Sequence, residues 1–197
     1  GDIDHVLFGP TGSEDFQYVT FFAKQSMIDM VVNMLGASTV QGTGVVVVGI
    51  DYDDLEPRDL VEITLEDDVV DGIYPPSSEW PLHREAYKAR PDAEMVIHSH
   101  ASFATTMACL ERAIPPFHYM VALSGGVTIP CLPYRQIGGE DLAREVATTL
   151  RDRHACLMGH HGMVVVGETV EKAIWRAKEL ENVCEQYWRA LQIREPD

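Results

Sequence analysis

The sequence contains few cysteines and no closely spaced pair of them. The four are Cys109, Cys131, Cys156 and Cys184. They form no C-x-x-C pair of the kind that binds metals, and the chain is not a small disulfide-dense framework, so we expect reduced packing residues. Long apolar runs are also missing, and stretches such as residues 45–48 are far too short to cross a bilayer. Because the first residues carry no export signal pattern, we expect a soluble cytoplasmic protein without a membrane partner.

Positive charge is scarce as well. The net charge is -16, with four lysines beside eleven arginines. Such a surface repels phosphate backbones and anionic membranes, which argues against nucleic-acid binding. A phosphorylated substrate would therefore need a local binding device. The acidic composition fits either an enzyme adapted to high salt or simply an acidic enzyme, and the sequence does not separate the two.

The length and composition predict one globular domain. A chain of 197 residues with 46% hydrophobic residues builds one full core and is too short for two ordinary domains. Residues 1–23 carry little periodicity and are predicted to form a loop-rich arm, while residues 24–197 form the domain. No internal repeat is present.

The apolar spacing within the domain predicts alternating helices and strands. We expect strands at 45–50, 61–65, 94–100, 155–158 and 163–166, and helices at 24–35, 82–89, 102–110, about 142–150 and 170–191. Thr169 is the predicted N-cap of the last helix. This order predicts a mixed α/β fold of three layers, in which helices cover a central sheet.

Histidines at alternate positions mark a candidate metal site. Alternate side chains of a strand share one face, about 6.6–6.8 Å apart, so His98 and His100 can converge on one ion. A catalytic zinc site commonly takes three protein ligands, and His161 is the best third candidate because it lies in a glycine-flanked turn. His98 alone would more simply be a core residue, but its pairing favours a metal site. The residues alone do not name the ion, because imidazole also suits nickel, copper and iron.

Further motifs follow one another along the second half of the chain. They are Pro76-Ser77-Ser78-Glu79-Trp80, His83, Tyr87, Arg90-Pro91-Asp92-Ala93, His98-x-His100, Ile114-Pro115, His118-Tyr119-Met120, Ile129-Pro130-Cys131 and His160-His161-Gly162. In order and spacing they resemble the class II aldolase/adducin family, and the resemblance covers more than half of the chain. It implies a mixed α/β subunit in a homotetramer with active sites between neighbouring subunits.

The resemblance also implies roles for single residues. It assigns a zinc ion to His98, His100 and His161, the histidine next to the glycine. It makes Glu79 the acid/base that also approaches the metal, and Tyr119 the proton donor supplied by the adjoining subunit. Without the resemblance, Glu79 would be interpreted as an exposed loop acid, and Tyr119 equally well as a core aromatic.

Phosphate binding is the least complete part of this assignment. The resemblance implies that Ser77 and Ser78 bind the phosphate, although alone they would indicate a simple turn. The glycine-rich segment at 42–44 runs into the 45–49 valine strand sooner than the family pattern does, which leaves Gly44 and Gly49 as the other candidates. A nucleotide-binding interpretation of these glycines lacks the third glycine and the acidic residue of that fingerprint.

The resemblance predicts a zinc-dependent carbon–carbon lyase. Its expected reaction is reversible cleavage of a ketose 1-phosphate, such as L-fuculose 1-phosphate, into dihydroxyacetone phosphate and an aldehyde such as lactaldehyde. Alternatives within the family are a deoxypentulose-phosphate aldolase, a pentulose-5-phosphate 4-epimerase and a methylthioribulose-phosphate dehydratase. A non-catalytic adducin-like scaffold is disfavoured because the three histidines and Glu79 are all present.

Overall fold

The computed structural model describes residues 19–23, 46–47, 61–63, 65, 69–71, 76–194 and 196. The predicted helix at 24–35 and the candidate residues Gly44 and Gly49 lie outside these residues. The strands are β1 (Val19–Ala23), β2 (Val46–Val47), β3 (Val61–Ile63), β4 (Val69–Asp71), β5 (Met95–Ser99), β6 (Cys131–Leu132), β7 (Ala155–Met158) and β8 (Gly162–Gly167). The helices are α3 (Trp80–Ala89), α4 (Ser102–Ala108), the 3-10 helix η3 (Tyr119–Ser124), α5 (Glu140–Leu150) and α6 (Val170–Leu191).

The larger sheet of the described residues has the strand order β1-β5-β8-β7-β6. Its pairs are antiparallel except for β6 and β7, which run parallel. Met95 lies opposite Gly167 and Ser99 opposite Met163, so the end of β5 lies beside the start of β8. This register brings the segment around residues 98–100 close to the turn that precedes β8. A smaller sheet has the order β2-β3-β4.

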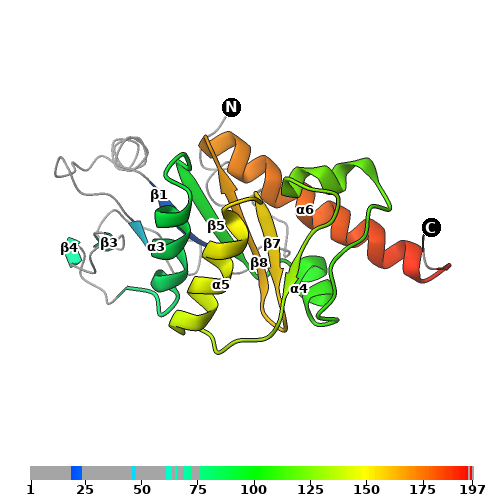
Figure 1. The fold of residues 1–197 in the computed structure, drawn as a ribbon, viewed down its shortest axis with the longest axis horizontal. Helices are drawn as coiled ribbons and strands as arrows, with labels where there is room; N and C mark the ends of the chain where they lie inside the picture. The colour runs from blue at the N-terminus through cyan, green and yellow to red at the C-terminus, as the bar shows by residue number, and fades with distance from the viewer. Residues whose placement is uncertain are drawn as a thin grey trace, which may run out of the picture.

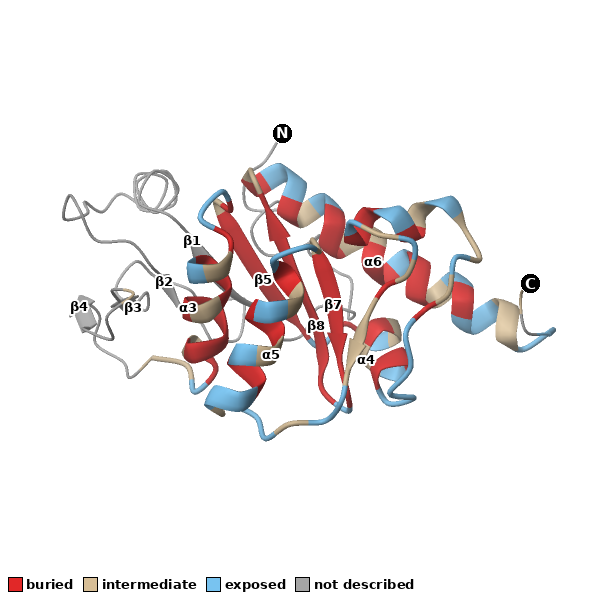
Figure 2. Ribbon diagram, viewed as in Figure 1, coloured by how far each residue is buried: buried red, intermediate tan, exposed pale blue. Residues whose placement is uncertain are grey.

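The larger sheet has a hydrophobic core on each face, because side chains alternate along its strands. Its central strands are buried on both sides (Figure 2). Odd-numbered residues of β5, β7 and β8, such as Met95, Leu157 and Val165, pack with α4 and α6. Even-numbered residues, such as Val96 and Val164, pack with α3 and α5. Helices thus cover both faces (Figure 1), which confirms the predicted three-layer α/β fold.

Most helices begin and end close to their predicted positions. The last helix has the predicted bounds, and the Thr169 side chain accepts a hydrogen bond from the backbone N–H of Lys172, as an N-cap does. Helix α3 packs beside α5, and Arg84 joins them by donating two hydrogen bonds of 2.9 Å to the carboxylate of Glu140. No described helix has the length and apolar character that a membrane crossing requires.

Three local features differ from the sequence predictions. Residues 19–23 form strand β1, so the segment predicted to be a loop-rich arm contributes a strand to the sheet by pairing with β5. Strand β5 ends at Ser99, so His100 lies just beyond the strand. The cysteines form no disulfide, as predicted, but Cys109 is exposed and is not a packing residue.

Candidate metal centre

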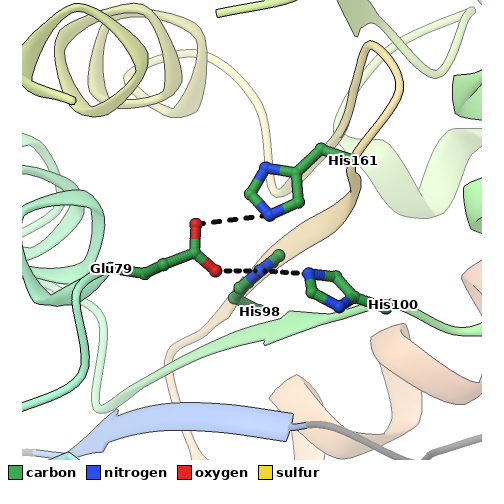
Figure 3. Close-up of side chains that lie close together, drawn as sticks. All are labelled: Glu79, His98, His100 and His161. Atoms are coloured by element: carbon green, nitrogen blue, oxygen red, sulfur yellow. Dashed lines mark hydrogen bonds and ion pairs between the residues drawn. The ribbon is translucent and has the colours of Figure 1, made fainter. Parts of the chain in front are cut away.

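Four side chains meet at the end of β5 that lies beside the start of β8. Glu79 directly precedes α3, His98 lies in β5, His100 follows that strand, and His161 lies in the turn between β7 and β8 (Figure 3). Each offers a ligand atom, and these atoms all lie within 4.8 Å of one another. Among the described residues, no other cluster of this kind was found.

The backbone before α3 fixes the position of Glu79. Its N–H donates a 3.3 Å hydrogen bond to Oγ of Ser77, and Pro81 fits the first turn of the helix, where a missing N–H costs nothing. Although Glu79 is the N-cap residue, its side chain makes no capping hydrogen bond. The carboxylate extends instead toward the histidines, and Glu79 as a whole residue is only 7% exposed. The interpretation as an exposed loop acid is therefore wrong.

The turn that carries His161 approaches β5 closely. Met158 pairs with Gly162, which leaves a three-residue loop between β7 and β8. A Cβ atom at position 162 would lie 2.5 Å from the carbonyl oxygen of Ser99. Glycine is required there because any side chain would push the two strands apart.

The atoms around the His98 ring include more hydrogen-bond acceptors than the ring has N–H groups to donate. Nδ1 of His98 lies 2.9 Å from the carbonyl oxygen of Met163, which only accepts, so Nδ1 carries a proton. Nε2 of the same ring lies 2.8 Å from Oε2 of Glu79 and 3.0 Å from Nε2 of His100. A single proton on Nε2 of His98 can serve only one of these two neighbours.

Other buried atoms of the cluster also have unused lone pairs. Oε1 of Glu79 lies 3.2 Å from Nε2 of His161, but Oε1 and both ring nitrogens of His161 make no hydrogen bond to a described residue. Buried polar groups in native proteins are normally satisfied by a partner, water or an ion. Three imidazoles and one carboxylate form a donor set suited to a divalent metal such as zinc. The residues present therefore fit a metal ion.

The charge states of the cluster are compatible with metal binding. Burial alone would raise the pKa of Glu79, but the close contacts with His161 and His98 hold that pKa well below its usual range. Burial and the charges of His98 and His161 lower the pKa of His100 to about 4. At neutral pH, Glu79 is therefore an anion and His100 a neutral imidazole, the forms that bind metals.

The remaining predicted residues lie outside the cluster. Ser77 and Ser78 precede Glu79 in the same loop, and Ser78 is exposed. Tyr119 begins η3 and is 80% exposed, so its interpretation as a core aromatic is wrong. His160 is exposed and lies beside Glu111, at 3.6 Å between Nε2 and Oε2, while its neighbour His161 joins the cluster.

The sequence matches the class II aldolase and adducin N-terminal domain over residues 21–188. The chain belongs to the class II aldolase/adducin family. The resemblance found from the sequence motifs is thereby confirmed.

Relatives of this class II aldolase/adducin chain carry aldolase names. A Rhodospirillum rubrum protein called 5-methylthioribulose-1-phosphate/5-deoxyribulose-1-phosphate aldolase is 46% identical over 76% of this chain and 67% of its own. The Escherichia coli K12 L-fuculose phosphate aldolase is 41% identical over 75% of this chain and 68% of its own. These names agree with the predicted enzyme class, a carbon–carbon lyase.

Solved structures of the family share the fold. A structure called L-fuculose 1-phosphate aldolase superposes with a TM-score of 0.80 and 26% identity, covering 95% of this chain and 82% of that one. The L-fuculose-1-phosphate aldolase of Thermus thermophilus superposes with a TM-score of 0.70 over 99% of this chain and 94% of its own. At 24% identity, the second likeness shows the fold alone.

Two features beside the cluster received no role from the sequence. The carbonyl oxygen of Met163, which orients His98, is a backbone atom and leaves no sequence signal.

The second feature is His83, which is completely buried, and its ring centroid lies 6.5 Å from that of His98. Burial and the charge of His98 hold the pKa of His83 well below its usual range. Its spacing of four residues from Glu79, about one helical turn, is a signal that could have placed it near the site.

Proposed function

We propose that this chain is a zinc-dependent aldolase that reversibly cleaves a ketose 1-phosphate into dihydroxyacetone phosphate and an aldehyde. The observation that carries this proposal is the group of three imidazoles and one carboxylate, in which buried atoms of Glu79 and His161 make no hydrogen bond to a described residue. Membership of the class II aldolase/adducin family and the names of the relatives support the reaction type.

His98, His100 and His161 would hold the zinc ion, with Glu79 close enough to approach it. When bound, zinc would polarise the carbonyl oxygen of the substrate and stabilise the negative charge that develops there. The hydrogen bond from Nδ1 of His98 to Met163 orients this imidazole and presents Nε2 to the ion.

Glu79 is the proposed acid/base. In the direction of condensation, its carboxylate removes a proton from the hydroxyl-bearing carbon of dihydroxyacetone phosphate, next to the carbonyl group. The lowered pKa of Glu79 keeps this carboxylate ionised at neutral pH, as a proton acceptor must be. In the direction of cleavage, the protonated Glu79 returns a proton to the same carbon after the carbon–carbon bond has broken.

Tyr119 is the proposed proton donor to the aldehyde oxygen during condensation. Its exposed side chain favours donation into the site of a neighbouring subunit. We therefore propose a homotetramer with shared sites.

Ser77, Ser78, Gly44 and Gly49 remain the proposed phosphate contacts. A cytoplasmic location stays a prediction.

Three ketose 1-phosphates are specific candidates for the substrate. The 46% identical relative is named for 5-methylthioribulose 1-phosphate and 5-deoxyribulose 1-phosphate, and the 41% identical one for L-fuculose phosphate. All three candidates would release dihydroxyacetone phosphate, and they differ in the aldehyde. The metal and the acid/base group would act on the shared part, so the cluster supports the reaction for any of the three substrates.

A substrate panel tests the proposal. The zinc-loaded protein is incubated with L-fuculose 1-phosphate, 5-deoxyribulose 1-phosphate, 5-methylthioribulose 1-phosphate and a pentulose 5-phosphate, and dihydroxyacetone phosphate is measured by coupled reduction. We expect cleavage of at least one ketose 1-phosphate and no change in the pentulose 5-phosphate. Epimerisation of the pentulose 5-phosphate, or failure to cleave any ketose 1-phosphate, would contradict the proposal.

A further inference from the structure

Two residues next to the metal cluster adopt a backbone conformation that side chains normally avoid. Glu111 has a φ of 48° and His160 a φ of 55°, and these are the only non-glycine residues with positive φ in the described part of the chain. Glycine is the usual residue in this left-handed region, including three-residue hairpin loops such as residues 159–161. Strained residues of this kind cluster at functional sites, where the surrounding structure holds them in place.

The two strained residues contact each other and the same neighbours. Oε2 of Glu111 lies 3.6 Å from Nε2 of His160, and the carbonyl oxygen of Ala108 accepts hydrogen bonds from the N–H groups of both residues. Oε1 of Glu111 accepts a 2.7 Å hydrogen bond from the N–H of Tyr134. One carboxylate thereby joins the end of α4, the segment after β6 and the turn between β7 and β8.

Gly159 shows how closely this carboxylate fits the turn. A Cβ atom at position 159 would lie 2.7 Å from Oε1 of Glu111 and 2.9 Å from the carbonyl oxygen of Leu132. The N–H of Gly159 donates a 2.8 Å hydrogen bond to that same Leu132 oxygen. The turn is therefore packed directly against the Glu111 carboxylate.

The turn held by Glu111 carries a metal-binding side chain. His161 follows His160 immediately, so the backbone direction at His160 sets the direction in which the next imidazole leaves the turn. Both ring nitrogens of His161 lack a hydrogen-bond partner among the described residues. Unlike His98, which is oriented by the carbonyl of Met163, His161 is held at its ring only by the 3.2 Å contact of Nε2 with Oε1 of Glu79 among the described residues, so its direction depends on its own backbone.

We propose that Glu111 is a positioning residue that holds the turn at Gly159 and His160 so that His161 points at the metal. This inference rests on the proposed metal centre and extends it to a carboxylate that is not itself a ligand. Partners outside the ligand set commonly contribute about 10- to 100-fold to metal affinity. Glycine at position 111 would remove the carboxylate but adopt the same backbone conformation without strain. A loss of zinc affinity in this variant would therefore reflect lost positioning and not a loss of folding stability.

The test compares zinc affinities of the full-length protein and its variants by competition with a chromophoric chelator. Glu111→Gly and Glu111→Ala should bind zinc about 10- to 100-fold more weakly than the unaltered protein. Glu111→Gln should recover most of the affinity, because its side-chain oxygen can still accept from the N–H of Tyr134. Glu185→Ala is the matched control, since Glu185 pairs with Arg189 on α6 and should leave the affinity unchanged.

Two further readouts distinguish positioning from a loss of structure. Glu111→Gly should keep the melting temperature of the metal-free protein, whereas the visible spectrum of its cobalt form should change because His161 moves. Zinc affinity and a cobalt spectrum equal to those of the unaltered protein in both Glu111→Gly and Glu111→Ala would overturn the positioning role and leave the metal centre intact. Failure of the unaltered protein to bind zinc would instead contradict the proposed function itself.

Discussion

Charged residues gather near both shared ends of strands β5 and β8, and the two groups differ in how completely their polar atoms are paired. At one end, Glu79 and three histidines face one another, and Oε1 of Glu79 and both ring nitrogens of His161 make no hydrogen bond to a described residue. At the other end, Arg90 donates to the carbonyl oxygens of Leu150 and Arg153 and to the carboxylate of Asp92. Both groups are partly or fully buried, so exposure alone does not distinguish them.

The end that contains Arg90 is called the paired end here, and a second arginine, Arg176, is also hydrogen-bonded there. Nη1 of Arg176 donates a 2.7 Å hydrogen bond to the carbonyl oxygen of Val166 and a 2.9 Å hydrogen bond to Oε2 of Glu168. Nη2 of the same side chain lies 3.2 Å from Oε1 of Glu168. These donors neutralise carboxylates and satisfy carbonyl groups at the ends of strands and helices.

The difference distinguishes charged residues that stabilise the fold from charged residues that are suited to bind a ligand. A buried polar atom without a partner costs about 1–3 kcal/mol, so a group of such atoms is stable only if something else satisfies them. At the paired end, the arginines and carboxylates satisfy one another and need no ligand. The end that contains Glu79 has a surplus of acceptors, which a metal ion would satisfy.

Equivalent substitutions at the two ends should have very different effects on catalysis. Glu79→Gln should lower kcat by about 10²- to 10⁴-fold, because a positioned acid/base group contributes about that much. Most of the zinc should remain bound, since three histidines still hold it. Glu168→Gln is the matched control at the paired end and should change kcat little. A loss below about tenfold in Glu79→Gln would assign the proton transfer to another group.

The proposed sharing of sites between subunits predicts the next largest effect. Tyr119→Phe should lower the rate of cleavage about 10²-fold, the lower limit for a general acid, without loss of zinc or change of assembly. Mixing impaired Tyr119→Phe subunits with impaired Glu79→Gln subunits should restore some activity, because some mixed sites regain both groups. No recovery, despite proven subunit exchange, would place Tyr119 in the site of its own subunit or outside catalysis.

The contrast between the two ends also explains what the sequence could predict. Alternation along a predicted strand at 94–100 indicated that His98 and His100 would converge, and their Nε2 atoms lie 3.0 Å apart although His100 follows the end of β5. The glycine beside His161 likewise predicted a close backbone approach, and position 162 has no room for a side chain. Both predictions depend on local geometry, which the order of residues determines directly.

Other features depend on contacts between distant segments and were not predictable from local patterns. The apolar content of residues 19–23 did not reveal that they pair with β5, because pairing is set by the rest of the sheet. The carboxylate of Glu111 meets the turn at His160 only after both segments have folded. The exposure of Tyr119 was also undetermined, since an apolar run is compatible with a core or an interface.

Removal of a donor from the paired end should reduce stability without affecting the metal. Arg90→Ala would leave the carbonyl oxygens of Leu150 and Arg153 without this donor, at a cost of about 1–3 kcal/mol in the free energy of unfolding. Urea unfolding measures this change, and zinc affinity should stay the same. If Arg90→Ala kept its stability but bound zinc more weakly, Arg90 would belong to the metal site and not to the stabilising network.

The paired end should also contribute a small dependence of stability on acid. The hydrogen bond from Arg176 outweighs the effect of burial and lowers the pKa of Glu168 from 4.5 to about 2. A carboxyl group with a lowered folded-state pKa stabilises the protein above pH 4.5, and this contribution is lost as the pH falls toward 2. The stability difference between the unaltered protein and Glu168→Gln should therefore shrink across this range. A constant difference in urea unfolding would rule out the assigned ion pair.

Metal dependence is the most direct test of the account. The protein is stripped with a chelator, its metal content is verified, and cleavage of a ketose 1-phosphate is followed while zinc, cobalt or manganese is added back. We expect no cleavage by the stripped protein, recovery at one ion per chain, and neither binding nor recovery in His98→Ala. Full activity in a demonstrably metal-free sample would contradict the proposed metal centre.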